Sequence, residues 1–264
     1  MNNMLHRLLT KLVFVLVIAI AFFNGAVFGT TEKDYTPDPA ITARIAENPQ
    51  IIHEKLTSSM NKLLNTPATL TIVITPYNEA GDKDCLEGRF KRVEVHTSRG
   101  QVENLFLHQA DIEFEDVQLD TRKLLEEDKI DPVSMRNINM DVIIKETDMN
   151  SFLEAKSKSI KVSNPEVKLL PDTMELSGST KYGMVKVEFW ATGKLSVKDG
   201  KEIHFHANRM KVNRMTMPRS FVGMIIKKIN PVLNLDKFPF KLNLSEIKIT
   251  RGEMNFTSYR KGSR

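Results

Sequence analysis

Apolar and polar residues alternate along most of the chain beyond residue 68, and this pattern predicts β-strands with one buried face. Segments with an apolar residue at every second position cover residues 70–74, 93–95, 110–119, 138–144, 185–197 and 203–212. A period of two places successive side chains on opposite faces of a strand. Asp199 and Gly200 separate the last two segments and favour a tight hairpin. We therefore expect antiparallel pairing.

The alternation slips by one residue at two places, which predicts bent strands. Val117 and Leu119 occupy odd positions, whereas Phe114 occupies an even one. A β-bulge near Glu115 and Asp116 would put these apolar side chains on one face. A second slip falls around residues 208–209, so we expect a strongly curved sheet.

Helical periodicity is confined to short segments. Pro49 suits a first helical position, and apolar residues recur at helical spacing up to residue 64. Residues 120–128 predict one or two helical turns. Thr147 or Asp148 can cap a further helix that runs through Phe152 and Leu153. Together these elements predict an α+β fold that is mostly antiparallel β, with a long curved sheet wrapped around the N-terminal helix.

The first residues resemble a targeting segment. His6, Arg7 and Lys11 precede an uninterrupted apolar run over residues 12–23. We expect residues 1–29 to act as a signal peptide or as an N-terminal membrane anchor, which leaves the protein exported, in the periplasm or on the outer face of the cytoplasmic membrane. Three further boundaries complete the predicted organisation, namely a linker over 30–48, one β-rich domain over 49–258 and a basic disordered tail over 259–264.

The amount of apolar sheet surface carries the functional prediction. A single-layer antiparallel sheet must cover its apolar face with helices, a second sheet or its own curvature. If two or three short helices leave part of that face uncovered, a hydrophobic groove or tube results, and its aliphatic lining suits lipid acyl chains. The alternative is a dry sandwich packed against itself. The predicted lining residues are Ile112, Phe114, Met140, Val142, Phe152, Leu153, Val187, Phe189, Phe221, Val222, Ile225 and Ile226.

A third predicted helix, over residues 219–229, combines an apolar arc with flanking cations. Its apolar residues include the last four of the predicted lining residues, and the cations are Arg214, Arg219, Lys227 and Lys228. Such a helix suits contact with anionic headgroups at the mouth of a cavity. A core-covering helix with a basic outer face would show the same pattern, so both interpretations stay open.

Composition narrows the possible functions. The formal net charge of +5 is spread along the chain, which favours an anionic lipid surface over nucleic acid as a partner. The single cysteine, Cys85, excludes an internal disulfide. Common hydrolase, zinc-protease and nucleotide-binding motifs are missing, so we expect no catalytic residues and no cofactor. His204 and His206 share one strand face and could bind zinc only with a third ligand from a neighbouring strand, so a solvated strand face is the favoured interpretation.

Several short motifs resemble those of the LmeA-like phospholipid-binding proteins. They are Gly88-Arg89-Phe90, the V-x-L-D ending at Asp120, the sequence Glu146 to Asn150, the G-x-L-x-V-x-D-G hairpin over 193–200, and the C-terminal pattern that starts at Asn230-Pro231 and ends at Gly252. The resemblance implies a tubular lipid-binding (TULIP-like) fold and phospholipid binding at an extracytoplasmic membrane face. It implies no catalytic residues. An envelope glycolipid-modifying enzyme and a scaffold for another envelope protein are the competing hypotheses.

Overall fold

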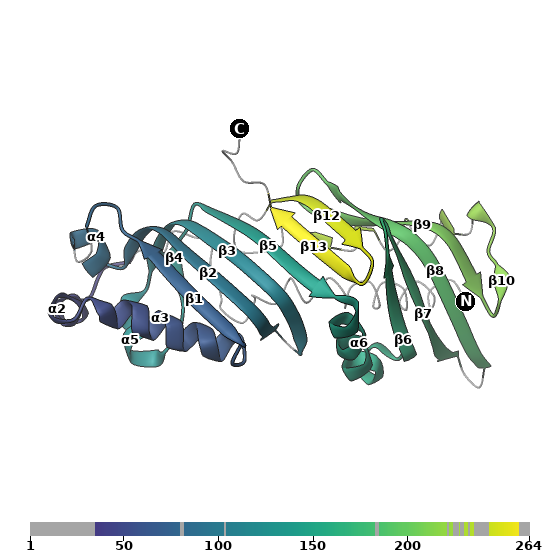
Figure 1. Ribbon diagram of the computed structural model, residues 1–264, viewed down its shortest axis with the longest axis horizontal. Helices are drawn as coiled ribbons and strands as arrows, with labels where there is room; N and C mark the ends of the chain where they lie inside the picture. Colours follow the sequence, from purple (N-terminus) through teal and green to yellow (C-terminus); the bar gives the residue numbers. More distant parts are fainter. Residues whose placement is uncertain are drawn as a thin grey trace.

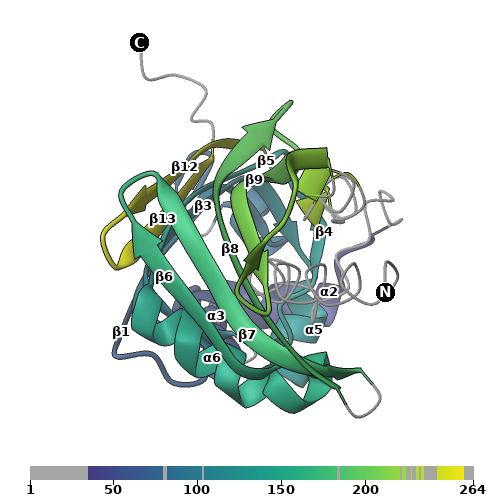
Figure 2. The same ribbon diagram turned by 90° about the vertical axis from the view of Figure 1, so that its right-hand side faces the viewer.

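The computed structural model confirms the predicted fold class. It describes residues 35–79, 82–102, 104–182, 185–220, 222–223, 227, 230–231, 233–234 and 243–258. The strands are divided between two curved antiparallel sheets that lie end to end along the long axis of the molecule (Figure 1). Seen along that axis, the strands of the second sheet cross the view diagonally in front of the first sheet (Figure 2).

The first sheet follows the order β1–β2–β3–β5–β13–β12, with β4 paired to β3. The bounds are β1 Thr69–Thr75, β2 Arg89–Val102, β3 Leu105–Leu119, β4 Pro132–Ser134, β5 Asn137–Lys145, β12 Leu244–Thr250 and β13 Glu253–Ser258. The last two strands of the chain therefore complete a sheet begun by the first strands. This long-range pairing could not be assigned from periodicity, since every strand shows the same alternation.

The second sheet follows the order β10–β9–β8–β7–β6, with β11 also paired to β9. The bounds are β6 Ser163–Leu170, β7 Thr173–Tyr182, β8 Val185–Lys198, β9 Glu202–Val212, β10 Met215–Thr216 and β11 Leu233–Asn234. Strand β12 of the first sheet contacts β6, β7 and β8 of the second. The apolar faces of both sheets therefore contribute to one continuous buried cluster.

One group of helices gathers at one end of the molecule, and another helix lies between the sheets (Figure 1). The group comprises α2 Pro39–Glu47, α3 Gln50–Leu63, α4 Lys83–Leu86 and α5 Thr121–Glu127, and the helix between the sheets is α6 Glu146–Ile160. Helix α3 packs against β1 and α5, whereas α6 packs against β3, β5 and β6. Within the described residues, no helix is both long enough and apolar enough to cross a membrane.

The predicted linker over residues 30–48 is wrong in its second part, because residues 39–47 form α2. Asp38 caps this helix by accepting a hydrogen bond of 2.9 Å from the Ala40 amide, and Pro39 occupies the first helical position. Ile41 and Ile45 lie one turn apart and are both buried. Two isoleucines thus suffice to dock a segment whose other residues are mostly polar. Residues 1–34 and 259–264, with the predicted targeting segment and tail, lie outside the described residues.

Helix α6 begins slightly earlier than predicted, after Lys145 instead of at a Thr147 or Asp148 cap. Asp148 has another role. Its carboxylate, only 6% exposed as a residue, accepts hydrogen bonds of 2.9 and 2.8 Å from Arg99 of β2. The same guanidinium lies 4.4 Å from the centre of the Phe106 ring. The pair therefore connects α6 to the first sheet.

Both predicted slips in the alternation are confirmed, but the bulge predicted at Glu115 and Asp116 is wrong, because the pairing register is constant there. Asp116 has a φ of 49°, and the buried positions shift parity there, so Val117 and Leu119 face the core together with Ile112. The buried positions of β2 change parity opposite this site, between Phe90 and Val93, so the pairing register of the two strands is unchanged. In the second sheet the β8–β9 register shifts between Thr192 and Gly193, opposite residues 207–209. The predicted Asp199-Gly200 turn is also present, with both residues at positive φ.

Candidate lipid-contacting face

Cross-strand rows of apolar side chains line the inner face of the first sheet. Ile72, Val95, Ile112 and Met140 are successive partners across β1, β2, β3 and β5. All four are buried. Because directly opposed residues on one face contact one another, these pairs make an uninterrupted aliphatic band across the sheet.

Two further predicted lining residues extend this surface. Val142 pairs with Ala110 on one side and with Phe256 on the other, and all three are buried. Phe114 is only partly buried, although it packs against the core. Of the four lining residues predicted in this sheet, Phe114 thus keeps the most surface available to a ligand.

The second sheet repeats the arrangement. Phe189 is buried, and Val187 of the same strand is partly buried. Of the other inward residues, Ala191, Phe205 and Met210 are buried, whereas Leu195, Val197 and Val212 are only partly buried. The apolar face therefore includes positions that neighbouring elements cover only in part.

Gly193 permits close packing at the centre of this sheet. A Cβ atom there would lie 2.7 Å from the ring of Phe205 and 2.4 Å from the His206 carbonyl oxygen. The ring therefore lies against bare backbone, a device that stabilises glycine positions in sheets. Phe205 consequently has no exposed surface.

The remaining predicted residues fall into three groups. Phe152 and Leu153 of α6 are completely enclosed, so they support the sheets from the core. Val222 is buried as well, and Arg214, Arg219 and Lys227 are exposed, as headgroup contact requires. Four predictions lie outside the described residues, namely Phe221, Ile225, Ile226 and Lys228.

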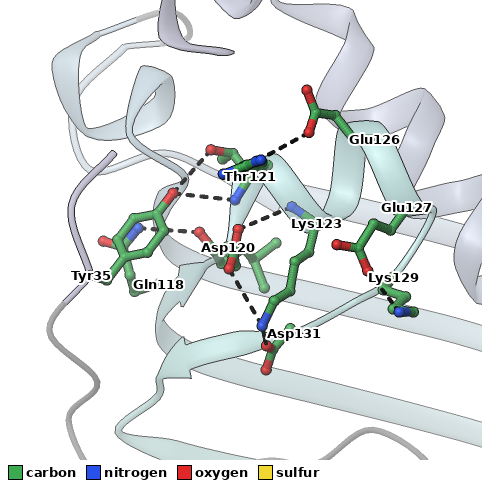
Figure 3. Close-up of polar contacts among 11 residues, drawn as sticks. Tyr35, Gln118, Asp120, Thr121, Lys123, Glu126, Glu127, Lys129 and Asp131 are labelled. Carbon is green, nitrogen blue, oxygen red and sulfur yellow. Dashed lines mark hydrogen bonds and ion pairs between the residues drawn. The ribbon is translucent and has the colours of Figure 1, made fainter. Parts of the chain in front are cut away.

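A dense polar network lies at the other end of the molecule, beside α5 (Figure 3). The Tyr35 hydroxyl is 3.0 Å from Thr121 Oγ1 and accepts a 3.3 Å hydrogen bond from the Thr121 amide. Asp120 caps α5 by accepting from the Lys123 amide at 3.0 Å. The Lys123 ammonium contacts Asp131, and this hydrogen bond raises the pKa of Lys123. The network joins the chain that precedes α2 to the body of the domain.

The same network depends on Gly88. Its φ is +81°, and an added Cβ would lie 2.5 Å from Thr121 Cγ2 and 2.8 Å from the Leu119 carbonyl oxygen. The Gly88 carbonyl accepts a 2.9 Å hydrogen bond from the Leu119 amide, and Gln118 donates to the Glu87 carbonyl at 2.6 Å. About thirty residues separate Gly88 from Leu119, so the spacing of the two motifs does not predict their contact.

The two histidines with metal-binding spacing each have a partner within the strand pair. His204 Nε2 lies 2.8 Å from Glu202 Oε2, and His206 Nε2 lies 2.7 Å from Ser196 Oγ. Nowhere in the described part of the chain do three His, Cys, Asp or Glu side chains gather as a metal site requires. The geometry thus gives no support to the zinc alternative.

The comparison with protein families agrees with the geometry of the sheets. The model of the LmeA-like phospholipid-binding family matches residues 84–258, more than half of the 264 residues. The chain belongs to the LmeA-like phospholipid-binding family. Neither a curated protein nor a solved structure matches the chain significantly. The matched range starts after β1, so α2 and α3 precede it.

Several motifs of the LmeA-like family now acquire a structural role in this chain. Gly88 and the V-x-L-D segment build the polar network at one end, and Gly193 accommodates Phe205 in the second sheet. Asn230 binds the backbone of β9 through its side chain. These motif residues shape the two sheets, whereas the apolar face itself is made by residues whose only common property is their aliphatic or aromatic side chain.

Proposed function

We propose that this protein is an extracytoplasmic phospholipid-binding or transfer protein that maintains cell-envelope lipids. Membership of the LmeA-like phospholipid-binding family supports a lipid partner. The apolar run over residues 12–23, preceded by basic residues, supports export. The positive net charge, which is distributed along the chain, supports a function at an anionic membrane surface.

One observation carries the proposal. The inner faces of both sheets form a continuous apolar surface on which Phe114, Leu195 and Val197 are only partly covered. Each methylene removed from water contributes about 0.8 kcal/mol, so an acyl chain lying along such a surface gains affinity without any specific polar contact. Family and surface therefore point to the same class of ligand.

The direct test is extraction of the purified protein into organic solvent, followed by mass spectrometry of the extract. We expect phospholipid in a near-constant ratio to protein. Extracts that contain none, from protein purified without detergent, would contradict the proposal.

A pair of variants on opposite faces of the first sheet sharpens the test. Phe114→Asp places a charge on the inner face, whereas Ile143→Asp places one at a partly buried position of β5 on the outer face. We expect Phe114→Asp to lower the amount of co-purified phospholipid and Ile143→Asp to leave it unchanged. Circular dichroism verifies that both variants are folded.

A further inference from the structure

An apolar row of the second sheet leads from the core to solvent at one edge. Phe189, Val212 and Met215 are successive partners across β8, β9 and β10, so their side chains share the inner face. Phe189 is 4% exposed, Val212 is partly buried, and Met215 is 65% exposed. The inner apolar face therefore continues to the rim of the sheet and ends there in an uncovered methionine.

The turn beside Met215 is short and well defined. Asn213 and Arg214 both have positive φ, 48° and 68°, as the central residues of a type I′ hairpin do. Asn213 also exchanges hydrogen bonds of 2.9 Å with the backbone of Glu188. This hairpin tip, residues Val212–Thr216, is thus hydrogen-bonded to β8 at the end of the molecule opposite α2 (Figure 1).

Cations surround the hairpin tip. The exposed basic residues on the neighbouring strand ends and on the segment that follows are Lys181, Lys186, Lys211, Arg214 and Arg219. Glu188 lies among them and forms a 3.0 Å ion pair with Lys186. An exposed apolar side chain within a basic rim is complementary to an anionic bilayer, which offers both hydrocarbon and negative headgroups.

We propose that the hairpin tip docks on anionic phospholipid bilayers, with Met215 inserted below the headgroups, and that acyl chains enter the protein along the Met215–Val212–Phe189 row. This inference rests on the proposed lipid function and adds the place at which the lipid passes. Arg214 and Lys211 would contact lipid phosphates. The Tyr35–Thr121 contact lies at the other end of the molecule.

The chain contains its own reporter for this surface. Trp190 is the single tryptophan, it is partly exposed on the outer face of β8, and it is paired with Lys211, the residue before Val212. The Lys211 ammonium lies 5.1 Å from the centre of its ring. Tryptophan fluorescence therefore reports on the neighbourhood of the hairpin tip alone.

The test uses the purified full chain with phosphatidylglycerol vesicles whose acyl chains carry bromine near the headgroup. We expect strong quenching of Trp190 fluorescence, and little quenching with brominated phosphatidylcholine. In Arg214→Asn, asparagine tolerates the positive φ, and the binding constant for these vesicles should fall about fivefold. Met215→Ser should lower the same binding constant about tenfold.

Matched variants at the other sheet keep the test specific. Val73→Ser removes an apolar side chain that is 42% exposed on β1, and Lys91→Asn removes an exposed cation of β2. Neither should change the quenching. Unchanged quenching in Met215→Ser and Arg214→Asn, or equal losses in all four variants, would overturn the proposed docking site.

Phospholipid extraction from the same samples separates this inference from the lipid function. Variants of the hairpin tip that still carry phospholipid but lose quenching support the docking site. A wild-type protein that shows the expected quenching and carries no phospholipid would support docking at the tip while contradicting the proposed lipid binding and the entry route.

Discussion

The carboxamide of Asn230 exchanges two hydrogen bonds with the backbone of Phe205. The Phe205 amide donates to Asn230 Oδ1, and Asn230 Nδ2 donates to the Phe205 carbonyl, each at 2.9 Å. One side chain thereby replaces a strand neighbour at the edge of β9, between the positions paired to β10 and to β11. Phe205 itself is completely buried, so these backbone groups need a protein partner.

Removing this carboxamide should destabilise the second sheet. Asn230→Ala leaves both backbone groups of Phe205 without their partner, and we expect a loss of about 1–3 kcal/mol in the free energy of unfolding, measured in urea. Asn208 is exposed on β9, the strand that contains Phe205, and Asn208→Ala should change the free energy of unfolding by less than about 0.5 kcal/mol. Equal stabilities of the two variants would show that the Asn230–Phe205 contact contributes nothing.

Gly88 and Gly252 allow steric and conformational effects to be separated. Both have positive φ, +81° and +78°, but a Cβ at Gly252 would meet no atom within 4 Å, whereas one at Gly88 would clash with Thr121 and Leu119. Gly252→Ala should lower the free energy of unfolding by about 1–2 kcal/mol, the penalty for placing an L-residue in the left-handed region. Gly88→Ala should lower the free energy of unfolding by about 1–3 kcal/mol more than Gly252→Ala does, because the added Cβ overpacks the site. Thermal unfolding measures both losses. Similar losses would mean that the network around Thr121 relaxes freely.

The Tyr35 hydroxyl gives a local prediction. Tyr35→Phe removes both contacts to Thr121, and we expect a loss of about 0.5–1.5 kcal/mol together with faster hydrogen exchange of the Thr121 amide. Tyr77→Phe removes a comparable hydroxyl contact, to Asp116, and serves as the control. It should leave the exchange of Thr121 unchanged. Exchange at Thr121 that is insensitive to Tyr35→Phe would show that the N-terminal segment is not held there.

Asp128 gives a pH-dependent prediction. Hydrogen bonds from Lys55 and Lys62, 2.7 and 2.8 Å long, lower the pKa of its carboxyl from 3.8 to about 2. The folded state therefore holds this group ionised more strongly than the unfolded state does. The resulting stability is present above about pH 4 and is lost as the pH falls toward 2.

Asp128→Asn tests this link between α3 and the end of α5. Asparagine tolerates the left-handed backbone at residue 128, where φ is 52°. We expect melting temperature to fall less steeply between pH 4 and pH 2 in the variant than in the wild type. The difference should shrink in high salt, because both lysines are partly exposed. Parallel pH profiles would contradict the assignment.

Periodicity alone determined the β-rich class, the Asp199-Gly200 turn, both slips in the alternation and the inward position of residues such as Ile112 and Phe189. These features depend on near neighbours, since a change of parity or a positive φ is written into a few consecutive residues. The segment around α2 was misjudged as a linker. Its apolar signal consists of only two isoleucines, and their docking site is made by distant parts of the chain.

Tertiary structure alone decided the rest. The sequence could not show that β12 and β13 return to the first sheet, that Gly88 lies against Thr121, or that Asn230 completes the edge of β9. The sequence predicted headgroup contact for Arg214, but it did not show that the neighbouring Met215 side chain is exposed. A hydrophobic residue in a strand looks the same in sequence whether its partners bury it or leave it at a rim. That difference arises from strand order and from which edges stay uncovered, which are properties of the assembled sheets.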